Sequence, residues 1–138
     1  MIIFPVNKKE ILKEVEDHLS RTENEILATM LLREEIEKPI PNSYKKLLNR
    51  KTEEGIKLIR LGFGSKEEYN MLSRKLVYKK NYSFFLIEKV ESYQRMIILD
   101  SKIVFFKAGK NFFKSNYKPV VKVFKDYFDL LKKKGKYG

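Results

Sequence analysis

The run from Asn81 to Phe106, NYSFFLIEKVESYQRMIILDSKIVFF, constrains the fold of this chain more than any other stretch. Aromatic and β-branched residues dominate it, and turn-prone pairs interrupt it at Glu91-Ser92 and Asp100-Ser101. It therefore predicts three successive strands joined by two tight turns. Its apolar residues come in continuous blocks, which is typical of strands that are covered on both faces. We expect helices to pack against both faces of the sheet.

Helical and strand patterns alternate along the rest of the chain. Apolar spacing and capping signals predict helices that begin after Asn7, Asn42 and Ser65, and a last helix from Pro119. The buried stripe of the third helix is predicted as Tyr69, Leu72 and Leu76. Predicted strands are Ile26–Leu32 and Ile56–Leu61, with a short strand or arm at Met1–Phe4 that Pro5 ends. Predicted loops are Glu34–Asn42, Gly62–Gly64 and Lys107–Lys118.

This order of elements predicts an α/β domain. We expect a layered sheet, largely parallel with an antiparallel hairpin extension, and helices on both faces. Residues 1–138 are expected to form one domain, with a frayed basic tail from about residue 132.

Charge is unevenly distributed along the chain. Residues 1–40 hold six Lys/Arg and nine Asp/Glu, whereas residues 41–138 hold twenty-four Lys/Arg and nine Asp/Glu. The excess of cations in the second part favours a polyanionic partner, nucleic acid before membrane. A surface that only solubilises the protein is the alternative, because Lys heavily outnumbers Arg.

The chain has no cysteine, so disulfides, thiolate metal sites and a cysteine nucleophile are excluded. Its first residues, MIIFPVNKKE, contain too short an apolar run for a signal peptide, and no later run reaches the length of a membrane span. We expect a cytoplasmic protein without a cofactor or a metal ion.

Two segments resemble the phospholipase D-like superfamily. The run TEEGIKLIRLGFG resembles its unit of basic helix, glycine and hydrophobic strand, and YQRMIILDSKIVFF resembles its HxKxxxxD stretch. On that motif, Tyr93 falls at the histidine, Arg95 at the lysine and Asp100 at the aspartate. The final helix is similar to the one that closes the sensor domains of TrmB-type archaeal regulators. The resemblance implies half of a phospholipase D-like fold, and an archaeal-like regulatory module that pairs as a homodimer.

The resemblance also implies that the site is degenerate. In active enzymes of the superfamily the histidine attacks phosphorus, whereas a phenol such as that of Tyr93 is largely protonated at neutral pH and suits this task poorly. The one histidine, His18, lies on the charged side of the first helix, where we expect it to face solvent. Asp100 is expected to start a hairpin turn.

The candidate residues fall into two groups. The ligand cleft is predicted to contain Tyr93, Arg95, Asp100 and Lys102, with Arg95 suited to an anionic ligand. Lysines and aromatics of the predicted loop could neutralise phosphates and stack on bases. These nucleic-acid-binding candidates are Lys107, Lys110, Phe112, Lys114, Tyr117 and Lys118, whereas Phe113 is expected to pack inward. A basic surface formed by Arg50, Lys51, Lys57 and Arg60 extends this set if the strand order places it beside the loop.

Three functional hypotheses follow. The first is a non-catalytic regulatory or nucleic-acid-associated binding module with a degenerate phosphodiesterase-like cleft. The second is a metal-dependent nuclease that uses Asp100, Lys102 and further acids. The third is a subunit that binds a larger protein partner and no nucleic acid.

Overall fold

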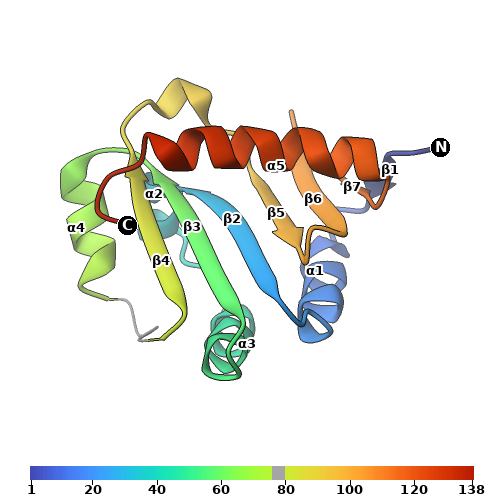
Figure 1. Ribbon diagram of the computed structural model, residues 1–138, viewed down its shortest axis with the longest axis horizontal. Helices are drawn as coiled ribbons and strands as arrows, with labels where there is room; N and C mark the ends of the chain where they lie inside the picture. The colour runs from blue at the N-terminus through green and yellow to red at the C-terminus, as the bar shows by residue number, and fades with distance from the viewer. Residues whose placement is uncertain (76–79) are drawn as a thin grey trace.

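A computed structural model of the chain describes residues 1–75 and 80–138 (Figure 1). The described residues form an open seven-stranded sheet in the order β1-β7-β6-β5-β2-β3-β4. The strands are β1 (Phe4–Val6), β2 (Glu25–Leu31), β3 (Lys57–Phe63), β4 (Tyr82–Ile87), β5 (Met96–Leu99), β6 (Ile103–Ala108) and β7 (Asn111–Ser115). The helices are α1 (Ile11–Ser20), α2 (Leu32–Glu37), α3 (Asn42–Glu53), α4 (Lys66–Ser73) and α5 (Lys118–Lys133), with a 3-10 turn η1 (Val90–Ser92).

Helices pack on both faces of the sheet, as the continuous apolar runs predicted. The helix α5 crosses one face of the sheet (Figure 1), where Phe128 and Leu131 pack against Leu61 and Ile98. On the other face, α1 and α3 cover Ile26, Leu58 and Ile97 through Val15, Leu19 and Leu48. A third cluster joins α2 and α4 to β4 and contains Leu32, Tyr69, Leu72, Phe84 and Leu86. None of the helices in the described part of the chain is long and apolar enough to span a membrane.

The predicted α/β fold class is confirmed, and the antiparallel part of the sheet is larger than expected. Strands β2, β3 and β4 run parallel, whereas β1, β7, β6 and β5 form antiparallel ladders that join β2. The sheet is therefore mixed, and its two halves meet between β2 and β5.

Of the two tight turns predicted in the organising run, one is confirmed and one is wrong. The turn at Asp100 and Ser101 joins β5 to β6, and both residues have φ 55°, as in the primed turns that favour hairpins. The segment around Glu91-Ser92 does not close a hairpin, because β4 lies at the sheet edge and β5 lies beside β2. Residues 88–95 are instead a crossing connection that includes η1.

Three predicted loop boundaries are also wrong. The segment predicted as the loop Lys107–Lys118 forms the end of β6 and the whole of β7, which pair as a hairpin around Gly109 at φ 63°. The start of the loop Glu34–Asn42 is the end of α2, which stops before Pro39. Strand β3 continues through Gly62 and Phe63, because pairing with β4 supplies partners for their backbone groups.

The N-terminal strand does not end at Pro5. That residue lies inside β1 and pairs with Phe113 of β7. Because β1 is the outermost strand, a proline that lacks an N–H group is tolerated there.

Of the predicted helix caps, the one at α4 is confirmed and those at Asn7 and Asn42 are wrong, because the N-cap residues of α1 and α3 are Glu10 and Pro41 and neither makes a side-chain cap bond. Ser65 and Glu68 form the predicted capping box of α4, with Ser65 Oγ accepting from the Glu68 N–H at 3.1 Å and Glu68 Oε1 accepting from the Ser65 N–H at 2.9 Å. Of the predicted α4 stripe, Tyr69 and Leu72 are buried, and Leu76 lies outside the described residues.

The C-terminal tail, which the sequence predicts to fray, lies against the sheet in the structure. Helix α5 continues to Lys133, and Lys136 then exchanges two backbone hydrogen bonds with Leu86 of β4, at 2.9 and 3.0 Å. The ring of Tyr137 lies against Tyr69, with centroids 5.3 Å apart. Because β4 is an edge strand, its outer backbone groups need partners, and the tail supplies them at Leu86.

Candidate functional site

A groove of about 580 Å³ opens on the sheet face that also carries α1 and α3. Its apolar floor comes from Ala28 and Met30 of β2, Ile97 of β5 and Phe105 of β6. Ile11, Leu12 and Val15 of helix α1 line one side of the groove. Helix α2 and the segment that follows it line another side. The groove lies where β2 ends and β5 begins. Ligands of open α/β sheets commonly bind at the carboxyl ends of strands.

One side of the groove, here called the cationic wall, consists of Arg95, Lys107 and Phe112. The Arg95 guanidinium carbon lies 5.7 Å from the centre of the Phe112 ring, and Lys107 Nζ lies 5.6 Å from it. The β6–β7 ladder pairs Lys107 with Phe112, and the Lys107 N–H donates to the Arg95 carbonyl at 3.1 Å. Arg95 is exposed, and the other two residues are half-buried. The wall thus presents two cations beside one aromatic ring.

A glutamine holds the backbone behind the cationic wall. Gln94 Nε2 donates to the carbonyls of Lys107 at 2.8 Å and Arg95 at 3.0 Å. The Gln94 N–H donates to the hydroxyl of Tyr127 on α5, and Thr29 Oγ1 donates to the Gln94 carbonyl at 2.6 Å. These bonds fix the wall in advance of any ligand. Sequence reasoning missed Gln94, because an amide between two motif positions carries no signal of its own.

Tyr93 lines the groove next to the cationic wall. Its ring packs against Phe63 with centroids 5.2 Å apart. Burial raises the pKa of the Tyr93 phenol to about 12, against the opposing effects of Arg95 and of a hydrogen bond with the Leu31 backbone. At neutral pH the phenol therefore keeps its proton and can serve as a hydrogen-bond donor, while its nucleophilic form is scarce.

The other side of the groove, here called the acidic wall, consists of Glu34, Glu35 and Glu37 of α2. Glu35 Oε1 accepts from the Ile40 N–H at 3.3 Å, and the charge of Glu34 is close enough to contribute to the raised pKa of Tyr93. The sheet order separates the two walls. Strands β5, β6 and β7 lie on one side of β2, and α2 packs with α4 on the side of β4. The groove therefore has Arg95 and Lys107 on one side, and on the other three carboxylates that outnumber the two cations Lys38 and Arg60.

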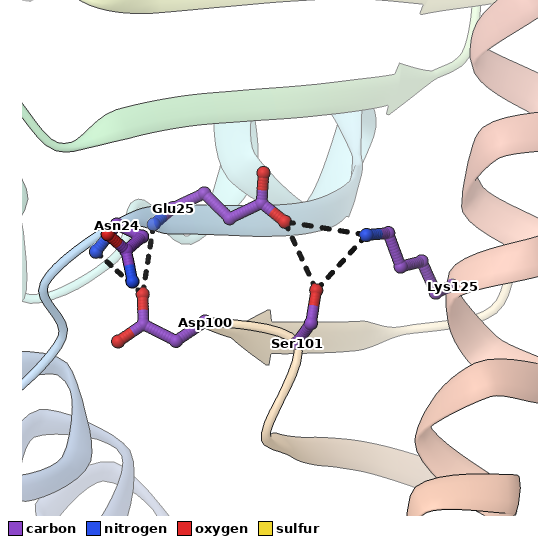
Figure 2. Close-up of polar contacts among 5 residues, drawn as sticks. All are labelled: Asn24, Glu25, Asp100, Ser101 and Lys125. Carbon is purple, nitrogen blue, oxygen red and sulfur yellow. Dashed lines mark hydrogen bonds and ion pairs between the residues drawn. The ribbon is translucent and has the colours of Figure 1, made fainter.

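The structure does not bring Asp100 and Lys102 into this groove. Both belong to the β5–β6 turn, at the end of β5 opposite to Tyr93 and Arg95. The Asp100 carboxylate accepts the backbone N–H groups of Asn24 at 2.7 Å and Glu25 at 3.0 Å (Figure 2). It also accepts the backbone N–H of Glu23 at 2.9 Å.

These three hydrogen bonds set the protonation of Asp100. Burial alone would raise the pKa of Asp100, but the bonds from the backbone outweigh it and hold the pKa below its usual value. Beside it, Ser101 Oγ donates to Glu25 Oε1 at 3.2 Å, and Lys125 Nζ of α5 donates to Ser101 Oγ at 3.1 Å (Figure 2). In this position Asp100 joins the hairpin to the start of β2.

The predicted nucleic-acid-binding residues are divided among three places. Lys107 and Phe112 belong to the cationic wall, and Lys110 lies in the exposed β6–β7 turn next to it. Lys114 forms an ion pair with Glu14 of α1. Tyr117 and Lys118 follow β7 at its far end, where α5 begins. Phe113 points away from the groove residue Phe112 and stacks on Phe106, with centroids 5.6 Å apart.

His18 does not face solvent as expected. It is half-buried on α1, and its ring packs edge-on against Phe105 with centroids 5.4 Å apart. Burial lowers its pKa, and the nearby charge of Arg21 lowers it further. Within residues 1–75 and 80–138, no group of three or more His, Cys, Asp or Glu side chains is arranged to hold a metal ion.

No family model and no curated protein matches this chain. Its structure is nevertheless similar to several solved structures. TrmBL2, an archaeal chromatin protein whose structure shows a novel mode of DNA binding, aligns with a TM-score of 0.71 and 18% identity over 99% of this chain and 54% of that chain. NucT from Helicobacter pylori aligns with a TM-score of 0.69 and 13% identity over 96% of this chain and 95% of that chain.

Nuc from Salmonella typhimurium, a phospholipase D family member, aligns with a TM-score of 0.65 and 10% identity over 97% of this chain and 94% of that chain. The chain therefore has the phospholipase D-like fold that the sequence resemblance implied. It spans about half the length of the TrmBL2 chain.

Proposed function

We propose that this chain is a non-catalytic, nucleic-acid-associated binding module whose groove is a degenerate phosphodiesterase-like site. The cationic wall carries the proposal. Arg95 and Lys107 flank the Phe112 ring in one groove, and two cations beside an aromatic face suit a phosphate and an adjoining base. The likeness in fold to a DNA-binding chromatin protein supports nucleic acid as the partner.

The state of two motif positions supports a role in binding without catalysis. Tyr93 holds the place of the attacking histidine, and its phenol with a pKa of about 12 is a weak nucleophile at neutral pH. Asp100 accepts three backbone N–H groups in the turn at the other end of β5, which occupies both of its oxygens. A regulatory role follows from this proposal, since a site that binds without cleaving can report or block access to its ligand.

The test is an anisotropy titration with short single- and double-stranded DNA and RNA, at low and moderate salt, with magnesium present and the product length measured afterwards. We expect binding that weakens as salt rises, and uncut product. In the variant R95A/K107A, the Kd at low salt should rise at least about tenfold, since two phosphate contacts are lost. The matched control is K66A/R74A, which removes the same charge from exposed positions on α4 and from its end.

Three outcomes would contradict the proposal. Cleavage that is lost in D100A would favour the metal-dependent nuclease. Equal losses of affinity in both double variants would make binding a general effect of the charge of +12. No binding at low salt would favour a subunit that binds a protein partner.

The pairing of two copies is part of the same proposal. The outer surface of α5 exposes Val123 and Leu130, at 66% and 58% of their full areas. These side chains offer an apolar surface for a homodimer. Light scattering should give twice the chain mass for the wild type and the single-chain mass for V123K/L130K; a wild type that is monomeric at high concentration would refute the dimer.

A further inference from the structure

The two walls of the groove differ in charge, and this difference restricts what the groove can take. A phosphate is attracted to Arg95 and Lys107 on the cationic wall. On the acidic wall, Glu34 and Glu37 are exposed and, with Glu35, outnumber the neighbouring cations Lys38 and Arg60, so this side repels a second phosphate. A uniformly anionic ligand that extends across the whole groove therefore fits it poorly, whereas a ligand with an anionic end and a hydrogen-bond-donating end fits both walls.

The dimensions of the groove suit a small ligand. Its volume of about 580 Å³ lies within the range of about 300–1,000 Å³ that is typical of small-molecule sites. The floor between the walls is apolar, with Ala28, Met30 and Ile97 beneath and Phe105 beside them. Such a floor can accept a flat ring or the carbon face of a sugar.

We infer that the groove takes one nucleotide unit with a terminal phosphate, as the end of a strand or as a free nucleotide. This inference rests on the proposed function and names the ligand of the same site. The terminal phosphate lies on the cationic wall, where its charge of nearly two can engage both Arg95 and Lys107. The hydroxyl or amino groups of the unit donate to the carboxylates of the acidic wall.

The surface beside the cationic wall provides a path for the rest of a strand. Lys110 lies exposed in the β6–β7 turn, two residues from Phe112 and three from Lys107. A strand whose end lies in the groove can leave over this turn, where a lysine meets its next phosphates. A strand interior has to continue past Glu34 and Glu37 as well, against the repulsion of like charges.

The experiment is a competition assay on the whole chain with a fluorescent, phosphorylated, linear single-stranded oligonucleotide as the probe. The competitors are the same linear sequence without label, its circularised form, adenosine monophosphate, adenosine and inorganic phosphate. We expect the linear phosphorylated strand to compete at least about tenfold better than the circle, and adenosine monophosphate to compete better than either adenosine or phosphate alone.

A second variant tests the acidic wall directly. In E34Q/E37Q, the preference for the linear strand over the circle should fall several-fold, because the circle no longer meets two carboxylates. The matched control E53Q/E67Q removes the same charge from exposed positions on α3 and α4, and should keep the preference. Glu35 is left unchanged, since it accepts the Ile40 N–H.

The outcomes separate this inference from the proposed function. The inference would be overturned, and nucleic-acid binding left intact, if the circular and linear oligonucleotides compete equally for the wild type and for E34Q/E37Q. Two results together would uphold the inference: adenosine monophosphate competes with the probe for the wild type, and R95A/K107A no longer binds the probe. Absence of binding to every nucleic acid, with adenosine monophosphate still bound by equilibrium dialysis, would refute the proposed function and assign the groove to free nucleotides.

Discussion

Burial determines what Tyr93 can do in the groove. Its position in the sequence identified it as the residue in place of the superfamily's histidine, but its protonation depends on neighbours from other elements. Phe63 packs on the ring, and the groove withdraws the hydroxyl from water, which raises the pKa to about 12. A phenol in this state can orient a ligand without attacking it.

The raised pKa of Tyr93 predicts a pH-dependent stability. An unfolded tyrosine loses its proton near pH 10, whereas the folded Tyr93 retains it until about pH 12. The free energy of unfolding should therefore fall as the pH rises from about 10 to about 12, because only the unfolded state releases the proton in this window. Urea denaturation across this range should show a smaller fall for Y93F. The exposed Tyr117 gives the control Y117F, and equal pH profiles for Y93F and the wild type would contradict the prediction.

Buried cations also depart from what the sequence indicates. Lys51 was considered part of a basic surface, yet it is only 6% exposed, and its Nζ donates to the carbonyls of Ser20 at 2.7 Å and Thr22 at 3.0 Å. A cation that donates to the carbonyls at the end of α1 in this way stabilises the fold and is withdrawn from ligands. Arg60 is likewise buried, at 5% exposure, and lies at the groove instead of on an outer basic surface.

At the scale of elements, the β5–β6 hairpin is attached to the start of β2 by side chains of its turn. Asp100 accepts three N–H groups from residues 23–25, and its own N–H donates to the Glu25 carbonyl at 3.0 Å. This junction lies in the middle of the sheet, where the parallel and antiparallel halves meet. The bonds therefore help to fix the register on which the groove at the other end of β5 depends.

Replacing Asp100 should destabilise this junction. D100N loses the charge and one acceptor, and we expect a loss of about 2 kcal/mol in the free energy of unfolding at pH 7, as for hydrogen bonds to a charged group. The lowered pKa means that the contribution is present above the ordinary carboxyl pKa and is lost as the pH falls through the folded-state value. The difference between D100N and the wild type in urea denaturation should therefore shrink below about pH 4.

The exposed Asp129 of α5 supplies the control for this prediction. D129N should have the same free energy of unfolding as the wild type at pH 7 and below about pH 4. A D100N protein as stable as the wild type at pH 7 would show that the three N–H groups find other partners at no cost.

The β6–β7 hairpin was not predicted from the sequence. Four lysines among the residues 107–118 favoured a loop, and only Gly109 signalled a turn. Pairing with β6 and β1 made this segment a strand, which placed Phe112 in the groove and Phe113 against Phe106. The division of the two phenylalanines between faces follows from the alternation of side chains along a strand.

At the scale of the whole molecule, the tail and the sheet edge depend on each other. Strand β4 would otherwise end the sheet with free backbone groups, and Lys136 pairs with it at Leu86. Phe85 lies beneath Gly135 and Gly138, where an added β-carbon would collide with the Phe85 side chain. The tail therefore covers part of an edge that could otherwise pair with another chain.

Removal of residues 134–138 should expose this edge. We expect a loss of about 2 kcal/mol in the free energy of unfolding, from two backbone hydrogen bonds and the contacts of Tyr137, and a greater tendency to self-associate in light scattering. The variant K136A keeps the backbone bonds and loses only the exposed ion pair between Lys136 and Glu88, so it should differ little from the wild type. A truncated chain with unchanged stability and mass would show that the tail is dispensable.

The sequence by itself determined the local features of this protein. It predicted the strands of the organising run, the turn at Asp100 and Ser101, the capping box of α4 and the start of α5, because each of these is encoded by neighbouring residues. It also predicted the fold class through the alternation of helices and strands and through the resemblance to the phospholipase D-like superfamily.

Only the tertiary structure decided which of these features meet. The place of β5 beside β2, far from β4, brought Arg95, Lys107 and Phe112 together and set them against the acidic side chains of α2. Asp100 and Lys102 lie at the opposite end of β5 because the whole strand, Met96–Leu99, separates them from Arg95. Sheet order results from packing between segments that are distant in the chain, and hydrophobic periodicity, which is local, does not contain it.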